Sequence, residues 1–333
     1  MNLKLAVVGA TGLVGQKIVS VLSERKFPYS ELLLAASDAS AGKQILVNSK
    51  SYTLLRMEEL VERNPDIALF SAGSGPSLKW APEITRRNGW VIDNSSAWRM
   101  HANVALVVPE INAHTITSSQ KIIANPNCST IQLVMALHAL HRKNKIKRLV
   151  ISTYQSVTGT GAHAVKQLLD ERSGKTPLKQ VYPHPIDLNI LPQVDVFLND
   201  GYTREEHKLM QETRKILESP EIAITATTVR VPVLGGHSES VNVQFEQAIS
   251  LEEVRNTISE SPGCKLLDAP EHSQYPMPLN VQEQDTVFVG RIRSDASAPH
   301  SFNLWIVADN LRKGAATNAV QIAEHLVNNW NTI

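Results

Sequence analysis

One cysteine lies among residues that favour chemical reactivity. Cys128 belongs to the segment 125–130, Asn-Pro-Asn-Cys-Ser-Thr, which precedes an apolar stretch with helical spacing. Pro126 disfavours helical geometry in the residue before it, and Asn127 or Ser129 can serve as a helix N-cap. A helix N-terminus lowers the pKa of a thiol, and its N–H groups can bind an oxyanion. Cys128 is therefore a candidate nucleophile, and the alternative is a small buried cysteine without a chemical role.

The second cysteine, Cys264, lacks comparable flanking residues and is assigned no role. Two cysteines among 333 residues exclude a disulfide framework. The Cys and His spacings do not indicate a zinc site, so we expect no metal.

A second group of candidates surrounds His237, seven residues after Arg230. An arginine can bind a carboxylate in a forked geometry, and a histidine can transfer protons near neutral pH. Glu205 and Lys208 form an i, i+3 pair on an expected helix, and Arg99 is a further possible anion ligand. Each has a simpler alternative. Arg230 could be an exposed strand residue and His237 a turn residue. The Glu205–Lys208 pair could be a weak surface ion pair, and Arg99 an exposed loop charge.

A glycine-rich turn opens the chain's first half. An apolar run over residues 3–8 leads into Gly9, Gly12 and Gly15, and apolar residues at helical spacing follow from Val14. Strand, glycine turn and helix in this order can place a pyrophosphate on a helix N-terminus. The spacing is G-x-x-G-x-x-G rather than the commoner G-x-G-x-x-G, so a glycine turn of another α/β protein is the alternative.

Short apolar segments then alternate with helix-like ones, which predicts a doubly wound parallel sheet. The expected strands cover 32–36, 67–72, 90–93, 104–108 and 122–124.

The segment 37–43 lies where ribose selectivity is normally set. Ser37, Ser40 and Lys43 could hold a 2′-phosphate, whereas Asp38 would repel one if it faced the ribose.

From about residue 148 the pattern changes to that of an α+β domain with a half-buried, antiparallel sheet. Helical spacing over 314–330 predicts a terminal helix that packs back on the first domain. Three prolines within 269–279 indicate a surface excursion or an oligomer contact. The other expected elements are strands over 149–156, 222–233, 240–245, 286–292 and 302–308, and helices over 162–170 and 203–218.

Charge and hydropathy exclude several classes of partner. The 33 Lys and Arg residues nearly balance 32 Asp and Glu residues, giving a net charge of +1. This balance argues against broad electrostatic binding of nucleic acid or membranes. Since no apolar run approaches the roughly 18 residues of a spanning helix, we expect a cytoplasmic protein.

Taken together, six segments in register resemble the aspartate-semialdehyde dehydrogenase family. The resemblance runs from residue 4 to about residue 325. The segments that carry it are 9–15, 93–99, 125–130, 152–155, 230–239 and 309–316.

The resemblance implies a homodimer that uses NADPH to convert L-4-aspartyl phosphate into L-aspartate 4-semialdehyde and phosphate, in lysine, methionine, threonine and diaminopimelate biosynthesis. It implies an α/β fold with a Rossmann-type NADP-binding domain over 1–127, completed by a C-terminal helix over 311–333. An α+β catalytic and dimerisation domain over 128–310 would carry a mixed, largely antiparallel sheet.

The resemblance also implies a role for each matching residue. Cys128 would form the acyl-thioester, His237 would be the general acid/base and Gln155 would orient the substrate. The substrate's carboxylate would bind Arg230, its ammonium Glu205, and its phosphate Arg99 and Lys208. The cofactor contacts would be Gly9, Thr11, Gly12, Leu13, Val14, Ser37, Ala39, Ser40, Thr158, Gly159 and Asn310.

One departure leaves the choice between NADP and NAD open. Ala39 stands where family members often carry an arginine, and Asp38 is beside it. Two other functions remain as alternatives. An N-acetyl-γ-glutamyl-phosphate reductase would offer no ammonium to Glu205, and a non-catalytic paralogue would typically lack the nucleophile.

Overall fold

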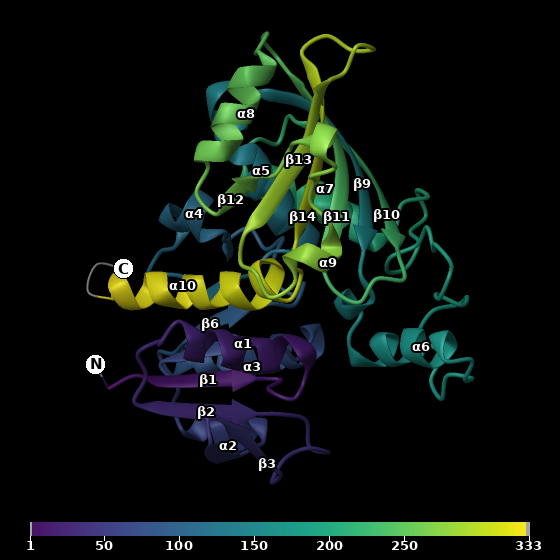
Figure 1. Cartoon of the computed structure of the whole chain (residues 1–333). Coiled ribbons are helices and arrows are strands. Elements are labelled where there is room, and N and C mark those ends of the chain that lie inside the picture. Colours follow the sequence, from purple (N-terminus) through teal and green to yellow (C-terminus); the bar gives the residue numbers. More distant parts are fainter. Residues whose placement is uncertain (1, 331–333) are drawn as a thin grey trace. The chain divides into compact units, whose positions relative to one another are not determined.

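The computed structural model describes residues 2–330 of the chain, and it divides them between two compact units (Figure 1). One unit ends at Pro126 and resumes at Ala315, and the other spans Asn127–Gly314. The limits expected from the sequence were residue 127 for the first domain and residue 310 for the second. Residues 331–333 of the expected terminal helix lie outside the described residues.

The first unit is built on a six-stranded sheet in the order β2-β1-β5-β6-β8-β7, and every pairing in it is parallel. The predicted doubly wound sheet is confirmed. The chain moves from β1 to β2 on one side and then to β5 on the other, so strand order reverses beside β1. The strands are β1 (Lys4–Val8), β2 (Glu31–Ala35), β5 (Ile67–Phe70), β6 (Trp90–Asp93), β7 (Ala105–Leu106) and β8 (Ile122–Ala124).

Helices cover both faces of this sheet, which explains its continuous apolar strands. Leu5 and Val7 of β1 pack with α1 and α10, whereas Ala6 and Val8 belong to the core formed with α2 and α3. The helices are α1 (Leu13–Glu24), α2 (Met57–Glu62), α3 (Ser74–Arg86), α4 (Pro109–Asn112), the 3-10 turn η1 (Ala113–Thr115) and α10 (Thr317–Asn328).

The terminal helix packs on the first unit, as predicted. Ala319, Val320 and Ala323 of α10 are fully buried in the core that contains Ile18 and Leu22 of α1. A π-helical turn, η4 (Arg312–Ala316), precedes α10 and replaces the α-helical start that the spacing predicted. Within residues 2–330, no helix is both long enough and apolar enough to cross a membrane.

A small antiparallel hairpin, β3 (Gln44–Val47) and β4 (Lys50–Thr53), was not expected. Asn48 and Ser49 at its turn have φ values of 48° and 65°, which suits a tight two-residue turn. Its mostly exposed strands give little apolar signal.

The second unit is built on a mixed sheet in the order β10-β9-β11-β14-β13-β12. The outer pairs β10·β9 and β12·β13 are parallel, and the three inner pairs are antiparallel, which confirms the expected sheet type. The strands are β9 (Ile146–Gln155), β10 (Ala223–Arg230), β11 (His237–Phe245), β12 (Cys264–Leu266), β13 (Val287–Ser294) and β14 (Ser301–Ala308).

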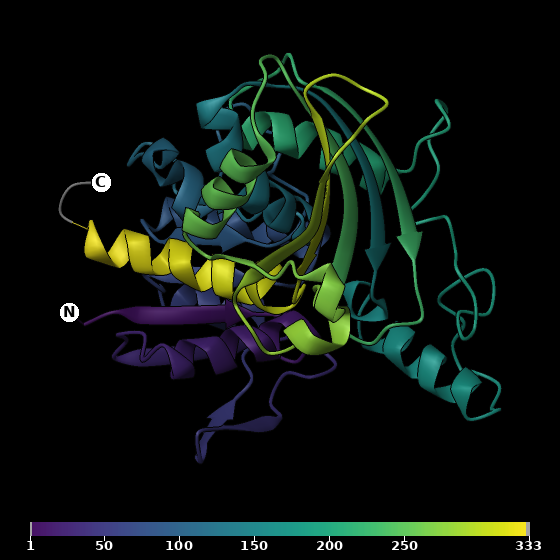
Figure 2. The same cartoon turned by 45° about the horizontal axis from the view of Figure 1, so that its top comes forward.

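One face of this sheet packs against helices. α5 contacts β9, β11, β13 and β14, while α7 contacts β10 and α8 contacts β12 and β13. Figure 2 shows β9, β10 and β11 running side by side, with α6 standing away from the sheet. The remaining elements of this unit are α5 (Cys128–Lys143), η2 (Val157–Gly159), α6 (Ala162–Arg172), α7 (Arg204–Ile216), α8 (Leu251–Glu260), η3 (Pro270–His272) and α9 (Pro278–Val281).

Candidate active site

Four strands of the mixed sheet bring polar residues to one edge. β9 and β10 are parallel, and their last residues, Gln155 and Arg230, are register partners. β11 is antiparallel to β9 and begins at this edge with His237. β14 is antiparallel to β11 and ends there with Ala308, the register partner of His237, two residues before Asn310. The topology therefore brings together residues that are far apart in the sequence. Gln155 and Asn310, for example, are separated by 155 positions.

His237 is fully buried, and its contacts define its protonation. Its Nδ1 atom lies 3.1 Å from the backbone nitrogen of Ser156 and 3.0 Å from the Ser156 hydroxyl. A backbone N–H can only donate, so in this bond Nδ1 accepts and Nε2 carries the proton. Burial and the nearby Arg230 cation lower the pKa of His237 to about 3. The side chain is therefore a neutral imidazole near pH 7.

Arg230 and His237 both lie against Gly159, and each has one side-chain nitrogen without a partner within residues 2–330. The Arg230 Nη1 donates to the Ser156 carbonyl at 2.6 Å, but Nε has no partner within residues 2–330, and neither has the His237 Nε2. A Cβ atom added to Gly159 would lie 3.1 Å from both Arg230 Nη1 and His237 Nε2. This glycine lets the backbone pack closely against two buried polar groups, where a Cβ would be crowded.

Cys128 is the first residue of α5, as predicted, and it is half-buried. The N-cap is Asn127, whose Oδ1 accepts from the N–H groups of Ser129 at 2.9 Å and Thr130 at 3.3 Å. These two N–H groups are therefore occupied by the cap. The expectation that the first-turn N–H groups form an oxyanion hole is wrong for Ser129 and Thr130, because the cap that orders the helix already uses them.

The N-terminus of α5 is held by two carboxylates of α7. Glu205 accepts from the Asn127 side-chain amide, and Glu212, two turns further along, accepts from the Asn127 backbone N–H, both at 2.7 Å. Both carboxylates are buried. Residues at i and i+7 lie on the same helix face, so both carboxylates of α7 can bind Asn127, the residue before Cys128.

Glu205 is the centre of a charged network. It accepts from Gln155 Nε2 at 3.3 Å and from Lys208 Nζ at 3.2 Å, and Lys208 also donates to Asp195 at 2.8 Å. Burial works to raise the pKa of Glu205, but Lys208 and the Asn127 amide outweigh it and hold that pKa below its usual value. Burial likewise opposes the charge on Lys208, yet its carboxylate partners raise its pKa. The structure thus joins Gln155, Glu205 and Lys208 to the helix that carries Cys128.

Arg99 belongs to the first unit and is also buried. Its Nε donates to the Asn125 carbonyl at 2.9 Å and its Nη2 to the Asn94 carbonyl at 2.7 Å. The Asn125 side chain donates to Asn94 Oδ1 and accepts from Asn318. Arg99 therefore ties the 93–99 segment to the turn before Cys128, and its expected phosphate contact stays a prediction.

The three glycines of the first turn serve different structural purposes. Gly9 has φ of 84°, and a Cβ there would lie 2.4 Å from the Ser71 carbonyl oxygen at the end of β5. A Cβ at Gly15 would lie 2.1 Å from the Gly9 oxygen, so this glycine permits close packing of α1 on the turn. Gly12 is the N-cap of α1 and has no side-chain cap.

This turn fits a dinucleotide. It follows β1 where strand order reverses, which is where open α/β sheets bind ligands, and a helix N-terminus without a side-chain cap suits a pyrophosphate. The remaining turn contacts expected from the sequence are Thr11, Leu13 and Val14, of which Thr11 is exposed.

The expected 2′-phosphate segment forms a turn after β2. The N–H groups of Ser40 and Ala41 donate to the Ser37 carbonyl at 2.8 and 3.0 Å. Ser37, Asp38, Ala39 and Lys43 are exposed, and Ser40 is half-buried.

Asn310 is an internal hydrogen-bonding centre. Its Oδ1 accepts from the Gly236 N–H at 3.1 Å and from the Ser156 hydroxyl at 3.0 Å, and its Nδ2 donates to Thr158 at 3.1 Å. Asn310 therefore holds Ser156, which contacts His237, and Gly236, which precedes it. Its expected cofactor contact stays a prediction.

Sequence reasoning missed several buried polar residues near the site. Ser156 contacts His237, and Glu212 contacts Asn127. The only sequence signal for Ser156 was its position beside Gln155, and the only one for Glu212 was its position seven residues after Glu205. Glu239 of β11 and Gln132 of α5 are almost fully buried, and their side-chain polar atoms have no hydrogen-bond partner in the described part of the chain.

Cys264 shows no feature of a reactive thiol. It begins β12, and its Sγ donates to the Met135 carbonyl at 3.4 Å. Within residues 2–330, no group of three or more His, Cys, Asp or Glu side chains is arranged to hold a metal ion.

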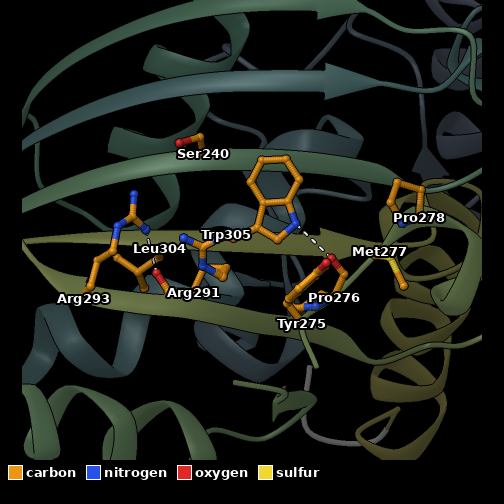
Figure 3. A pocket seen from close by; sticks show the side chains of 9 residues that line it. All are labelled: Ser240, Tyr275, Pro276, Met277, Pro278, Arg291, Arg293, Leu304 and Trp305. Atoms are coloured by element: carbon orange, nitrogen blue, oxygen red, sulfur yellow. Dashed lines mark hydrogen bonds between the residues drawn. The ribbon is translucent and has the colours of Figure 1, made fainter. Parts of the chain in front are cut away.

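A pocket on the other face of the mixed sheet contains none of the predicted residues (Figure 3). The Trp305 indole donates to the Pro276 carbonyl at 3.0 Å and packs against Tyr154, with ring centroids 5.5 Å apart. The proline-containing segment 269–279 thus lies over this face. The pocket is lined by Ser240, Tyr275, Pro276, Met277, Pro278, Arg291, Arg293, Leu304 and Trp305.

Two protein-family models match the chain, one in each unit. The family model described as semialdehyde dehydrogenase, NAD binding domain, matches residues 4–119, and the one described as semialdehyde dehydrogenase, dimerisation domain, matches residues 137–313.

Relatives match over nearly the whole chain. Aspartate-semialdehyde dehydrogenase from Aquifex aeolicus is 49% identical, with 98% of each chain covered. The enzyme of the same name from Bacillus subtilis is 42% identical, covering 98% of this chain and 97% of its own. A crystal structure of aspartate semialdehyde dehydrogenase II from Vibrio cholerae, complexed with ASA, superposes with a TM-score of 0.94 at 41% identity and 99% coverage of both chains. A Candida albicans structure with NADP has a TM-score of 0.77 at 25% identity, covering 98% of this chain and 99% of its own.

Proposed function

The chain belongs to the aspartate-semialdehyde dehydrogenase family, and on this premise we propose that it converts L-4-aspartyl phosphate into L-aspartate 4-semialdehyde and phosphate with NADPH. The observation that carries the proposal is the strand edge where Arg230 and His237 each have a side-chain nitrogen without a partner within residues 2–330. This edge is linked through Gln155 and Glu205 to the cap of the Cys128 helix. The product would enter lysine, methionine, threonine and diaminopimelate biosynthesis.

Cys128 is the nucleophile of the first step. The position of its thiol at the start of α5 favours the thiolate. The sulfur attacks the acyl carbon, the bond to phosphate breaks, and a thioester forms with release of phosphate. Arg99 and Lys208 are the proposed ligands of the departing phosphate charge.

His237 assists at the oxygen atom that gains negative charge. In the tautomer that accepts from the Ser156 N–H, the proton is on Nε2, which lies close to Gly159. It can therefore donate to the oxyanion of a tetrahedral adduct. This donor takes over a task for which the N–H groups of Ser129 and Thr130 are not available.

The charged side chains match a small zwitterion. Arg230 would bind the α-carboxylate through Nε, which has no partner in the described part of the chain. Glu205 would receive the α-ammonium, and Gln155, which already donates to Glu205, would orient the acyl group. The two charges and the amide would thus fix the substrate relative to Cys128.

The glycine turn would hold the cofactor. The residues proposed to contact it are Gly9, Thr11, Gly12, Leu13 and Val14, with the 2′-phosphate near Ser37, Ala39, Ser40 and Lys43, and with Thr158, Gly159 and Asn310 from the second unit. When bound, the reduced nicotinamide supplies the hydride that reduces the thioester. We propose NADP rather than NAD because Ser37, Ser40 and Lys43 offer donors for a 2′-phosphate.

A homodimer is part of the same proposal. The face of the mixed sheet opposite α5 exposes side chains such as Tyr154 and Trp305 in part, and the matched family model is described as a dimerisation domain. We propose that a second copy of the chain covers this face in the cytoplasm. Trp305→Glu should then convert the dimer into a monomer in light scattering, whereas an unchanged mass would contradict this interface.

The reaction is tested in the reverse direction. Purified protein should reduce NADP⁺ with aspartate semialdehyde only when phosphate is present. N-acetylglutamate semialdehyde should give no comparable rate, because its blocked amine cannot form the proposed contact with Glu205. A higher rate with that substrate would indicate the acylated-substrate reductase, and no rate with either would indicate a non-catalytic paralogue. A marked preference for NAD⁺ would overturn the cofactor assignment.

A further inference from the structure

We propose that Asp195 competes with phosphate for Lys208: its carboxylate binds the lysine in the resting protein and leaves it when phosphate binds. The inference rests on the proposed role of Lys208 as a phosphate ligand, and it concerns how strongly phosphate is held. Asp195 does not touch the substrate in this proposal. It acts on phosphate through Lys208.

Two carboxylates already bind the Lys208 ammonium. Its Nζ donates to Asp195 Oδ2 at 2.8 Å and to Glu205 Oε2 at 3.2 Å. Burial opposes the negative charges, but Lys208 outweighs it and holds the pKa of both carboxyl groups below their usual values. Two carboxylates and one ammonium leave the cluster with a net negative charge, which repels an incoming phosphate. Lys208 therefore becomes an effective phosphate ligand when one carboxylate moves away.

Glu205 is the carboxylate that stays. Its side chain is only 8% exposed. Its Oε1 accepts from the Asn127 side-chain amide at 2.7 Å and from Gln155 Nε2 at 3.3 Å. Moving Glu205 would leave these buried donors without their acceptor, which is costly. Phosphate therefore does not displace Glu205.

Asp195 is the carboxylate that can leave. It lies in the connection that precedes α7, and its side chain is 26% exposed. Its Oδ1 accepts from the Val196 N–H at 2.9 Å, and the exposed Arg204 guanidinium lies 4.0 Å from the same oxygen. Water can replace the contacts of such a partly exposed carboxylate at small cost. The Asp195–Lys208 contact is thus the one that phosphate can exchange for its own.

This exchange affects phosphate in both directions of the reaction. A ligand that binds only a fraction of its sites in the competent state has an apparent affinity reduced by that fraction. The competent state here is Lys208 without Asp195. Phosphate entry is therefore weakened, and phosphate release is assisted because Asp195 returns to Lys208.

The test is the affinity of the protein for inorganic phosphate, measured by isothermal titration calorimetry. Asp195→Asn removes the charge, keeps an oxygen for the Val196 N–H and suits the φ of 68° at this position. It should bind phosphate about fivefold more tightly than the wild type, which matches the contribution of a partly exposed ion pair.

Asp200→Asn is the matched control. Asp200 lies in the same connection, is exposed, and pairs with His207 of α7 at 2.7 Å rather than with Lys208. The variant changes the net charge by the same amount and should leave the phosphate affinity unchanged. An equal gain in Asp200→Asn would show that net charge alone is responsible and would overturn the proposal.

The kinetic consequence is confined to one substrate. In NADP⁺ reduction with aspartate semialdehyde, Asp195→Asn should lower the KM for phosphate by about the same factor. The KM for NADP⁺ should not change, a split that general damage to the structure would not produce. An Asp195→Asn protein that binds phosphate no more tightly than the wild type would overturn the proposal. If the wild type shows no phosphate-dependent turnover, the proposed function fails, while the calorimetry still decides whether Asp195 competes with phosphate.

Discussion

A Cβ atom added to Gly159 would lie 3.1 Å from the Nε2 atom of His237. The same atom would be 3.1 Å from Arg230 Nη1, so this glycine borders both groups that are proposed to bind substrate. Its backbone is in a region open to other residues, since it is absent from the positive-φ glycines. Its importance therefore lies in the close approach to both side chains that it allows.

Gly159→Ala should lower kcat/KM by about 10²-fold, because displacing a reacting group by about 1 Å has that effect. The unfolding midpoint should fall only modestly, because the added Cβ crowds two side chains but does not strain the backbone. Gly174 is exposed and has a φ of 70°, a backbone conformation that strains a side chain. Gly174→Ala should therefore lower stability without a comparable loss of activity. Full activity in Gly159→Ala would show that the reaction does not depend on the positions of Arg230 and His237.

The glycine turn allows a matched comparison of two positions. A Cβ at Gly15 would lie 2.1 Å from the Gly9 carbonyl oxygen, whereas one at Gly12 would lie 3.4 Å from it. Gly15→Ala should therefore destabilise the protein by about 1–3 kcal/mol, as overpacking does, and weaken NADP⁺ binding. Gly12→Ala should have a clearly smaller effect on stability. Denaturant unfolding and cofactor fluorescence titration measure both effects, and equal stability losses would contradict the packing argument.

Glu239 should make stability fall as pH rises. It is fully buried, and burial raises its pKa well above the usual value, while Gln132 nearby only partly counteracts this. A folded-state pKa above the unfolded one gives stability that is present at low pH and is lost as pH rises toward the folded value. Glu239→Gln removes this loss.

The Glu239→Gln variant should therefore unfold at a higher temperature than the wild type at pH 8, with a smaller difference at pH 5. In a domain of this size, 1 kcal/mol corresponds to about 2–4 °C. Glu252→Gln, at an exposed position of α8, is the control and should show no such pH dependence. A Glu239→Gln variant that is less stable than wild type at pH 8 would mean that the carboxylate is ionised and paired.

Glu212 should tune the reactivity of Cys128. Its carboxylate accepts from the N–H of Asn127, directly before the nucleophile, and a nearby negative charge raises a thiol pKa. Glu212→Gln keeps an acceptor but removes the charge. In a Cys264→Ser background, alkylation of Cys128 by iodoacetamide at pH 6–7 should become several-fold faster, while Glu218→Gln should leave the rate unchanged. A slower reaction would show that the helix start depends on the full carboxylate.

The sequence predicts those parts of the fold that leave a clear apolar pattern. The strands of the first unit were identified because burial on both faces makes them continuously apolar, as in 4–8 and 67–70. The strand β11 was expected to begin at residue 240, but it begins at His237. Its first three residues are polar yet buried, so the apolar pattern does not reveal them. The β3–β4 hairpin was missed because it is mostly exposed.

The site was predictable only where a residue type suggested chemistry. Cys128 and its N-cap Asn127 followed from helix-capping rules, and the structure confirms both positions. The roles of Ser156, Glu212 and Asn310 depend on distances between residues far apart in sequence, such as the 3.0 Å between Ser156 and Asn310. No local pattern encodes such contacts. The oxyanion expectation is wrong for Ser129 and Thr130, because the cap that orders α5 uses their N–H groups.

The central claim is that Cys128 forms a thioester during phosphate-dependent oxidation of aspartate semialdehyde. The most direct measurement compares wild type with Cys128→Ala in NADP⁺ reduction by aspartate semialdehyde with and without phosphate, alongside NADP⁺ binding. The account predicts phosphate-dependent NADPH formation by the wild type and no measurable turnover by Cys128→Ala, with cofactor affinity unchanged. Substantial phosphate-dependent turnover by Cys128→Ala would contradict it.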